Sequence, residues 1–270
     1  GNAKALPTLQ ALVAAYPELL NQKSAGKKGQ PALFQALVQG RKEIVAWLLS
    51  QPRLVMPTDL GAFLQEVLGQ IGLVETRHVP GIRALVQLAV QQFDQQIIDA
   101  HAIRFADAPP PGKREIQQRR ASLFSDAQKQ VLGTIPKLQP LFEEHKLILP
   151  HSAVTADKPE MASPAISPAR SASDKADKST DQSFHALREA AVAGDTEKVI
   201  AALKSVNNAD ALARRRDSQG MTALMYAASA GHTATVAAIL QAVKDRDTLA
   251  CIQSHSGATA LMQAILSRNS

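Results

Sequence analysis

Apolar residues recur along this chain at the spacing of α-helices. Val236, Ile239 and Leu240 lie three and four positions apart, which places them on one face of a helix. Two longer stretches between residues 58 and 106 show the same spacing, and so does the stretch from 113 to 132. The pattern predicts an all-α fold in which helical faces form the core.

The helical pattern repeats with a fixed period towards the end of the sequence. Gly220 and Gly257 are 37 positions apart, and the threonines two positions after them keep the same distance. One further step back brings the segment that begins at Leu187 into the same frame. Because self-similarity at such a period is the signature of a repeat architecture, we expect three copies in residues 183–270, the last of them cut short.

Residues 217–232 resemble the ankyrin-repeat family, whose pattern is D-x-x-G-x-T-P-L-H-x-A-A-x-x-G-H. Gly220 falls where the hairpin turn needs a positive φ, Thr222 where the first helix needs an N-cap, and Gly231 where the chain turns between two antiparallel helices. The resemblance implies an ankyrin-repeat solenoid of helix-turn-helix repeats with hairpin loops. The proline and histidine of the family's TPLH segment are absent here, which implies repeats less rigid than the consensus.

The period is longer than the family's usual length of about 33 residues. We expect the roughly four extra residues of each copy to follow its second helix, around 206–209 and 244–247.

A fainter copy of the same signature lies in residues 1–57. Residues 29–40 occupy the frame from the turn glycine to the glycine between the helices, and 44–49 supply a second helix. Upstream, residues 9–21 resemble the end of a preceding repeat. We therefore expect ankyrin-like repeats in residues 1–57.

The middle of the chain lacks the hairpin signature. Residues 58–106 are expected to be helical, as divergent repeats or as a cap, and residues 113–149 to form amphipathic helices, the first over 113–132. Residues 150–182 are rich in Pro, Ser, Ala, Asp and Lys and poor in large apolar residues, which favours a flexible linker. Two repeat segments joined in this way need not stack on each other.

The charge of the chain is mildly basic. Lys and Arg number 30 against 24 Asp and Glu, a net charge of +6. This excess favours a protein partner with an acidic surface, but spread over the whole chain it does not by itself indicate nucleic acid. Basic residues in 113–120 could favour RNA or a membrane surface, but they are more typical of the solvated face of a packed helix.

No motif for catalysis, cofactor binding or metal binding is found in the sequence, and no apolar run is long enough for a membrane helix. The one cysteine, Cys251, excludes an internal disulfide and a multi-thiolate metal site. Its nearest candidate partner for nucleophilic catalysis is His255, but a structural role, with Cys251 as a small buried hydrophobe, explains both residues better. We therefore expect no catalytic site, no cofactor and no metal.

The resemblance implies a binding surface on the concave face, made of hairpin loops and first helices. Tyr226 is the first choice for a contact residue, because an aromatic side chain at a variable position suits a binding hot spot. A structural role for its ring, covering apolar residues below, is the alternative. The other expected contact residues are variable or basic positions of the same repeats: Met221, Ser218, Gln219, Ser229, Arg215, His255, Gln263, Lys27, Lys28 and Gln35.

Three functions are compatible with these features. The leading hypothesis is a non-catalytic scaffold that binds a protein partner. The second is a substrate-recruiting arm of a longer enzyme or of a secreted bacterial effector, and the third is weak nucleic-acid binding through the basic loops and helix 113–120. We expect a cytoplasmic location or secretion into a host cell; the sequence begins without methionine and looks like a fragment, so targeting signals could lie outside it.

Overall fold

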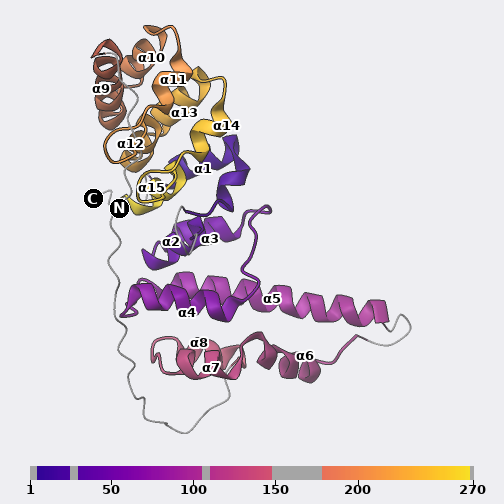
Figure 1. Ribbon diagram of the computed structural model, residues 1–270. Helices are drawn as coiled ribbons and strands as arrows, with labels where there is room; N and C mark the ends of the chain where they lie inside the picture. The colour runs from indigo at the N-terminus through magenta and orange to yellow at the C-terminus, as the bar shows by residue number, and fades with distance from the viewer. Residues whose placement is uncertain (1–4, 25–29, 105–109, 148–177, 268–270) are drawn as a thin grey trace.

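The computed structural model describes residues 5–24, 30–104, 110–147 and 178–267, and all regular structure in these ranges is helical (Figure 1). The elements are α1 (Ala5–Ala15), η1 (Pro17–Leu20), α2 (Ala32–Val38), α3 (Lys42–Leu49), α4 (Leu60–Ile71), α5 (Val79–Arg104), α6 (Lys113–Arg120), η2 (Ala121–Leu123), α7 (Asp126–Gly133), α8 (Gln139–Glu144), α9 (Lys178–Ala193), α10 (Thr196–Lys204), α11 (Ala209–Arg214), α12 (Ala223–Ala230), α13 (Thr233–Ala242), α14 (Arg246–Cys251) and α15 (Ala260–Leu266).

The helices stack in pairs, in an order that differs from their order along the chain. From the top of Figure 1 the layers are α9 with α10, α12 with α13, α15 with α1 and α2 with α3; α4 and α5 then pack on α2 and α3 respectively, and α7 with α8 comes last. The first helices contact one another from layer to layer, as α9, α12, α15, α2 and α4 do in turn. One apolar core therefore runs through the whole stack.

Local hydrogen bonds explain why the repeat segments fold as they do. The backbone N–H of Asp217 donates to the carbonyl of Met221 at 3.0 Å, which closes the hairpin loop before α12. Thr222 then caps the helix by accepting from the N–H of Met225 at 3.3 Å. After α12, Gly231 turns the chain in the left-handed region, with φ of 75°. The loop before α15 closes in the same way. We call these two loops, residues 217–221 and 254–258, the fingers.

A third, short helix follows the second helix in two of the copies, beside the extra residues of the 37-residue period. α11 and α14 follow the second helices α10 and α13, and are capped by Asn208 and Asp245. The Asp210 carboxylate accepts from the backbone N–H groups of Lys244 and Asp245, at 2.9 and 3.1 Å. The insertion therefore adds polar bonds between neighbouring repeats.

The repeat that contains α15 receives its second helix from the other end of the sequence. α1 packs against α15 and α13, in the position that α13 occupies beside α12. Its buried residues Leu9, Leu12 and Val13 have the same spacing as the buried stripe of α13. The two repeat segments, which the sequence left free to separate, form one stack in this structure.

The layers below follow the same plan. The N–H of Ser24 donates to the carbonyl of Gln30 at 3.0 Å ahead of α2, as at the base of a finger. α4 packs on α2 and α5 on α3, and the rings of Phe34 and Phe63 meet edge to face at 5.8 Å. The helical region 58–106 thus adds a layer to the stack.

Two expectations about the middle of the chain need correction. The helix expected over 113–132 is broken into α6, η2 and α7, because Ser125 and Gln128 form a capping box that starts a new helix. The expected linker over 150–182 ends earlier, since α9 begins at Lys178, and its residues up to 177 lie outside the described ranges.

Among the described helices, none combines the length and the apolar character that crossing a bilayer requires.

Candidate protein-interaction surface

Fingers and first helices line one face of the upper repeats, and the two fingers are bonded to each other. The backbone N–H of His255 donates to the carbonyl of Gln219 at 3.0 Å, across the boundary between two repeats. This approach is possible because Gly220 has no side chain: a Cβ there would lie 2.6 Å from the His255 nitrogen. The fingers are therefore held in register along the stack.

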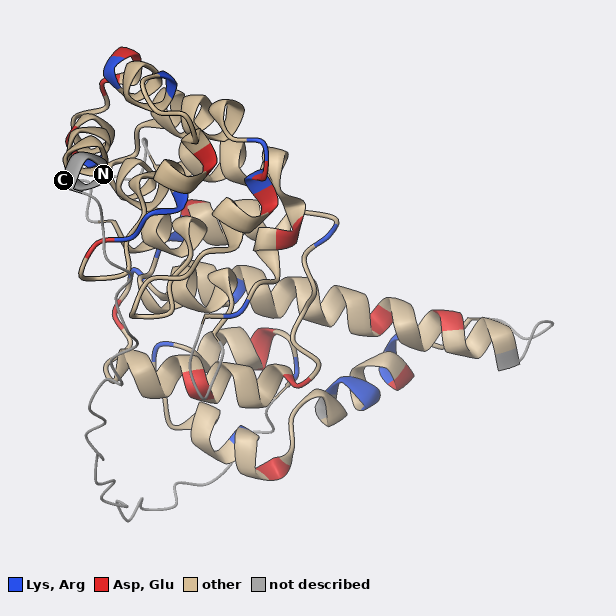
Figure 2. Ribbon diagram, turned by 45° about the horizontal axis from the view of Figure 1, so that its top comes forward, with Lys and Arg blue, Asp and Glu red and all other residues tan. Residues whose placement is uncertain are grey.

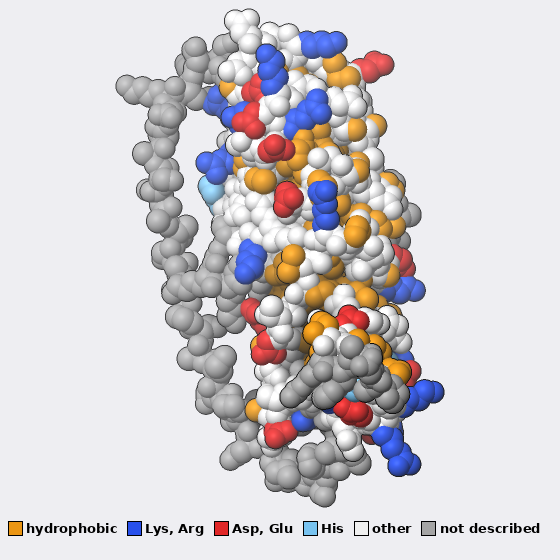
Figure 3. Space-filling view, turned by 90° about the vertical axis from the view of Figure 1, so that its right-hand side faces the viewer, with side chains coloured by type: hydrophobic (Ala, Val, Ile, Leu, Met, Phe, Trp, Pro, Cys, Tyr) orange, Lys and Arg blue, Asp and Glu red, His pale blue; other side chains and the backbone are white. Residues whose placement is uncertain are grey.

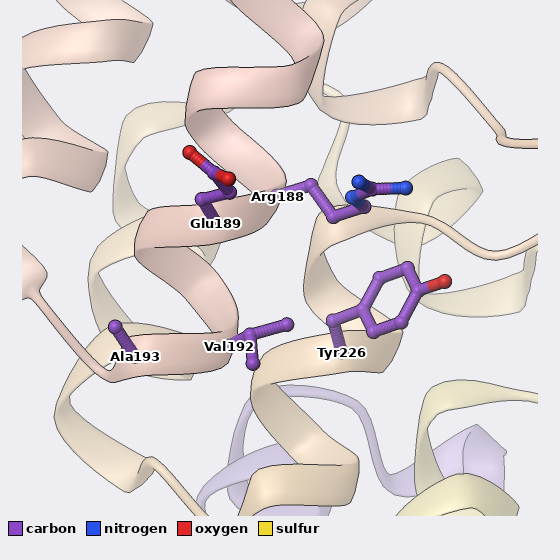
Figure 4. A pocket seen from close by; sticks show the side chains of 5 residues that line it. All are labelled: Arg188, Glu189, Val192, Ala193 and Tyr226. Carbon is purple, nitrogen blue, oxygen red and sulfur yellow. The ribbon is translucent and has the colours of Figure 1, made fainter.

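A hollow of about 470 Å³ lies between α9 and α12, lined by Arg188, Glu189, Val192, Ala193 and Tyr226 (Figure 4). Val192 points from α9 towards Tyr226 on α12, and the Arg188 side chain extends above the tyrosine ring. Val192 is 50 % exposed, which is unusual for a large apolar residue on a packed helix. The hollow offers an apolar wall beside groups of both charge signs.

Tyr226 is tied to the finger of its own repeat. Its hydroxyl donates to Oδ2 of Asp217, whose other oxygen accepts from the backbone N–H groups of Gln219 and Met221 at 2.8 and 2.9 Å. Burial alone would raise the pKa of Asp217, but these hydrogen bonds and nearby Arg188 hold the pKa below its usual range. Burial and the Asp217 carboxylate together raise the pKa of Tyr226. The hydrogen bond from the neutral Tyr226 hydroxyl to the Asp217 carboxylate thus fixes the position of the tyrosine ring.

The contact residues expected at the fingers differ in exposure. Ser218, Gln219 and His255 are exposed at the turns. Met221 is buried at 8 % exposure, so its side chain packs beneath the finger and offers little surface to a partner. Its apolar side chain, at the base of the hairpin, joins the core instead.

The contact residues expected on the helices and further along the stack are half-buried: Ser229, Gln263, Arg215 and Gln35. The Ser229 hydroxyl donates to the Tyr226 carbonyl at 3.2 Å, and the Gln35 amide donates to Gln30 at 3.0 Å. Lys27 and Lys28 lie outside the described residues. Of the expected set, Tyr226 lines the hollow.

Sequence reasoning missed two residues at this site. Arg188 aligns with Met225 of the next copy, which is buried, so its place in the repeat gave no sign of a surface role. Asp217 was used only as a motif position, although a carboxylate nine residues before a tyrosine across a hairpin could have indicated the hydrogen bond between them.

The Cys251 and His255 pair gains no support as a catalytic pair. Desolvation and nearby Asp247 raise the pKa of the Cys251 thiol, which opposes the thiolate that a nucleophile needs. Cys251 is exposed and so is not the buried hydrophobe expected from the sequence. Within the described ranges, no three side chains of the metal-binding types gather in one place.

Several of the basic residues that suggested nucleic acid are held in ion pairs. Arg120 on α6 bonds Asp94 on α5, and Arg119 pairs with Glu115 at 2.8 Å. Figure 2 shows the basic positions of α6 close to acidic positions on the long helix α5. Arg214 pairs with Asp245 at 2.8 Å. On the face shown in Figure 3, lysine and arginine side chains are mixed with acidic ones, with apolar areas between them, and they form no patch of one sign.

Comparison with known proteins identifies the upper part of the stack. Residues 173–270 match the family model of ankyrin repeats, in three copies. No curated protein and no solved structure matches the chain. The family match and the all-helical layers confirm the predicted ankyrin-repeat fold for this region. Residues 173–270 thus belong to the ankyrin-repeat family, whose repeats are protein-interaction modules and typically not catalytic.

Proposed function

We propose that this chain is a non-catalytic scaffold that binds a protein partner on the concave face formed by its fingers and first helices. The hollow between α9 and α12 is the observation that carries the proposal. It places an exposed valine beside a tyrosine whose ring is fixed by a hydrogen bond. Rigid aromatic side chains next to apolar surface are the usual anchors of protein interfaces.

The partner's chemistry follows from charge. The chain carries a net charge of +6, and Arg188 stands at the rim of the hollow. A partner segment with an apolar side chain for the Val192 wall and a carboxylate for Arg188 fits this arrangement. Opposite net charges would also speed the encounter, so association should slow as salt is added.

The two alternative functions have less support. Nucleic-acid binding would need unpaired basic groups in one place, whereas Arg119, Arg120 and Arg214 are engaged with carboxylates. A recruiting role within a longer enzyme would use the same protein-binding face, and no feature of the described residues favours it over a free-standing scaffold.

A capture experiment with matched variants tests the proposal. Val192→Glu places a charge in the hollow, and Val131→Glu places the same charge on α7, where Val131 is 48 % exposed against 50 % for Val192. We expect a partner retained by the unmodified chain and by Val131→Glu to be lost from Val192→Glu and from Tyr226→Ala. Circular dichroism checks that each variant is folded.

Retention of the same partner by all four chains would show that the hollow is not the binding site. Equal loss from Val192→Glu and Val131→Glu would also contradict the proposal, because it would reflect a general effect of added charge.

A further inference from the structure

A groove separates the second helices of two neighbouring layers. α10 packs against α13, and α13 packs against α1. α1 and α3, both within the described ranges, do not pack on each other in this way, although their layers are neighbours in the stack (Figure 1). A groove of about 410 Å³ opens between α1 with η1 on one side and the end of α3 on the other. We call it the outer groove.

The short element that follows α1 explains why the outer groove is open. In the layer of α9 and α10, α11 follows the second helix and packs both against α10 and against α13 of the next layer. The element that follows α1 is η1, a 3-10 turn of four residues that begins with Pro17. η1 packs against α1 but does not bridge to α3 as α11 bridges to α13. The space between η1 and the end of α3 is therefore left unfilled.

The lining of the outer groove is largely apolar and includes several rings. Val13 of α1 and Leu20 of η1 line it and are buried. Pro17 and Pro52 contribute a pyrrolidine ring from each side, and Trp47 of α3 contributes a half-buried indole. An indole offers a large, rigid apolar face together with one N–H donor. A ligand that presents apolar rings and backbone carbonyl groups would match this lining.

Asn21 ties the two sides of the outer groove together. Its side-chain amide donates to the carbonyl of Arg53 at 2.8 Å, and its side-chain oxygen accepts from the backbone N–H of Val55 at 2.8 Å. Asn21 comes directly after η1, whereas both of its partners belong to the segment that follows α3. A ligand would therefore meet walls that are already fixed relative to each other, which reduces the entropy lost on binding.

Arg53 gives the outer groove a positive charge. Among the described residues that line the groove, it is the one that carries a charge. Its side chain is exposed, and it takes part in none of the ion pairs found in the described ranges. A guanidinium with free N–H groups binds a carboxylate through two parallel hydrogen bonds. The charge of the groove thus selects a ligand with an acidic group beside its apolar part.

We propose that the outer groove binds an extended, proline-containing segment of a partner protein that carries a carboxylate beside the proline. Such a segment forms a polyproline II helix, which is ordered before binding and leaves its backbone carbonyls free to accept hydrogen bonds. Grooves lined by aromatic rings are the usual sites for these segments. Trp47 and the two prolines supply the apolar walls, and Arg53 binds the carboxylate. The site is built from second helices, so it is separate from the hollow between the first helices α9 and α12.

Trp47 makes binding at this place directly measurable, because it is the one tryptophan of the chain. An acetylated and amidated peptide of three Pro-Pro-Glu units serves as the probe and has no fluorescence of its own. We expect the tryptophan emission of the full chain to change in a saturable manner as this peptide is added. A peptide of three Pro-Pro-Lys units tests the charge, and a peptide of three Gly-Ser-Glu units tests the polyproline II conformation. Both should bind more weakly than the probe, by roughly fivefold or more.

Charge reversal at Arg53 tests the assigned contact. The Arg53→Glu chain should bind the Pro-Pro-Lys peptide more tightly than the Pro-Pro-Glu peptide, by about twofold to fivefold, as expected for one exposed ion pair. The bond to Asn21 is kept, because it uses the backbone carbonyl of residue 53. Arg188→Glu is the matched control, since it makes the same charge change at the hollow between α9 and α12. This control should keep the preference for the acidic peptide, and circular dichroism checks that both variants retain their helices.

Several outcomes would overturn the proposal. One is the absence of a saturable change in Trp47 emission with the Pro-Pro-Glu peptide up to millimolar concentration. Another is an Arg53→Glu chain that still prefers the acidic peptide, or an Arg188→Glu chain that loses this preference equally, because the charge would then act from elsewhere. Binding of the Gly-Ser-Glu peptide as tight as that of the probe would show that charge alone is recognised. The Val192→Glu chain should respond to the probe like the unmodified chain, so this test is independent of the function proposed for the hollow.

Discussion

The hydroxyl of Tyr226 donates a hydrogen bond to Oδ2 of Asp217, nine positions earlier in the same repeat. The bond joins the first helix of the repeat to its finger, and Tyr226 also lines the hollow that we propose as the binding site. The tyrosine therefore has a structural role through its hydroxyl and a proposed binding role through its ring, and the two roles can be separated.

Replacement of Tyr226 by phenylalanine should lower the free energy of unfolding while leaving partner binding largely intact. The variant loses one hydrogen bond to a charged group, which contributes about 1.5–3 kcal/mol in such settings, but keeps the aromatic surface. Urea unfolding of Tyr226→Phe, Asp217→Asn and the double variant forms a cycle that isolates the pair. We expect the effect of Tyr226→Phe to be smaller in the Asp217→Asn background; strictly additive losses would show that the two side chains are not coupled.

Replacement of Gly220 by alanine should destabilise the fingers. Gly220 has φ of 75°, and a Cβ would lie 2.6 Å from the backbone nitrogen of His255. A left-handed conformation and a clash with backbone together cost about 1–3 kcal/mol. Urea unfolding and amide exchange at His255, whose N–H bonds Gln219, measure the loss.

Gly69→Ala is the matched control for this substitution. Gly69 lies inside α4, and a Cβ there would meet no atom within 4 Å. Alanine at this position should raise the free energy of unfolding by about 0.5–1 kcal/mol, because glycine is a poor helix former. A stabilising effect at Gly220 as well would mean that the finger does not need the left-handed conformation.

Local features of this fold could be predicted from the sequence because they depend on neighbouring residues. The turn at Gly220 and the cap at Thr222 follow from the backbone conformation that each position needs. The capping box at Ser125 was equally local, and its Ser-x-x-Gln spacing was available in the sequence. Attention to this motif would have divided the helix expected over 113–132.

The place of α1 in the stack could not be predicted in this way. The sequence indicated that residues 9–21 end a repeat and that the copy at α15 is incomplete, but periodicity carries no information on whether two distant halves meet. Their pairing depends on contacts between α1 and α15, which bury residues such as Leu12 and Leu261 from opposite ends of the sequence. The burial of Met221 was missed for a similar reason, since a variable position of the motif packs inward here.

The stability of the protein should fall as the pH drops below about 6.5, because of His78. His78 is 2 % exposed, and its Nδ1 accepts a hydrogen bond from the N–H of Glu75 at 3.0 Å. Burial and the neighbouring charge of Arg77 lower the pKa of His78 from the usual 6.5, with Glu75 acting in the opposite direction. The unfolded chain therefore binds a proton here at a higher pH than the folded chain does, and acidification through this window favours unfolding.

The comparison of the unmodified chain with His78→Asn isolates this contribution. Asparagine does not titrate in this range, and its side-chain oxygen can replace Nδ1 as the acceptor for the Glu75 N–H. Urea midpoints measured at intervals from pH 7.5 to pH 5 should decline more steeply for the unmodified chain than for His78→Asn. Parallel declines would show that the proton taken up on unfolding binds to another residue. A steeper decline for His78→Asn would show that folding raises the pKa of His78 instead of lowering it.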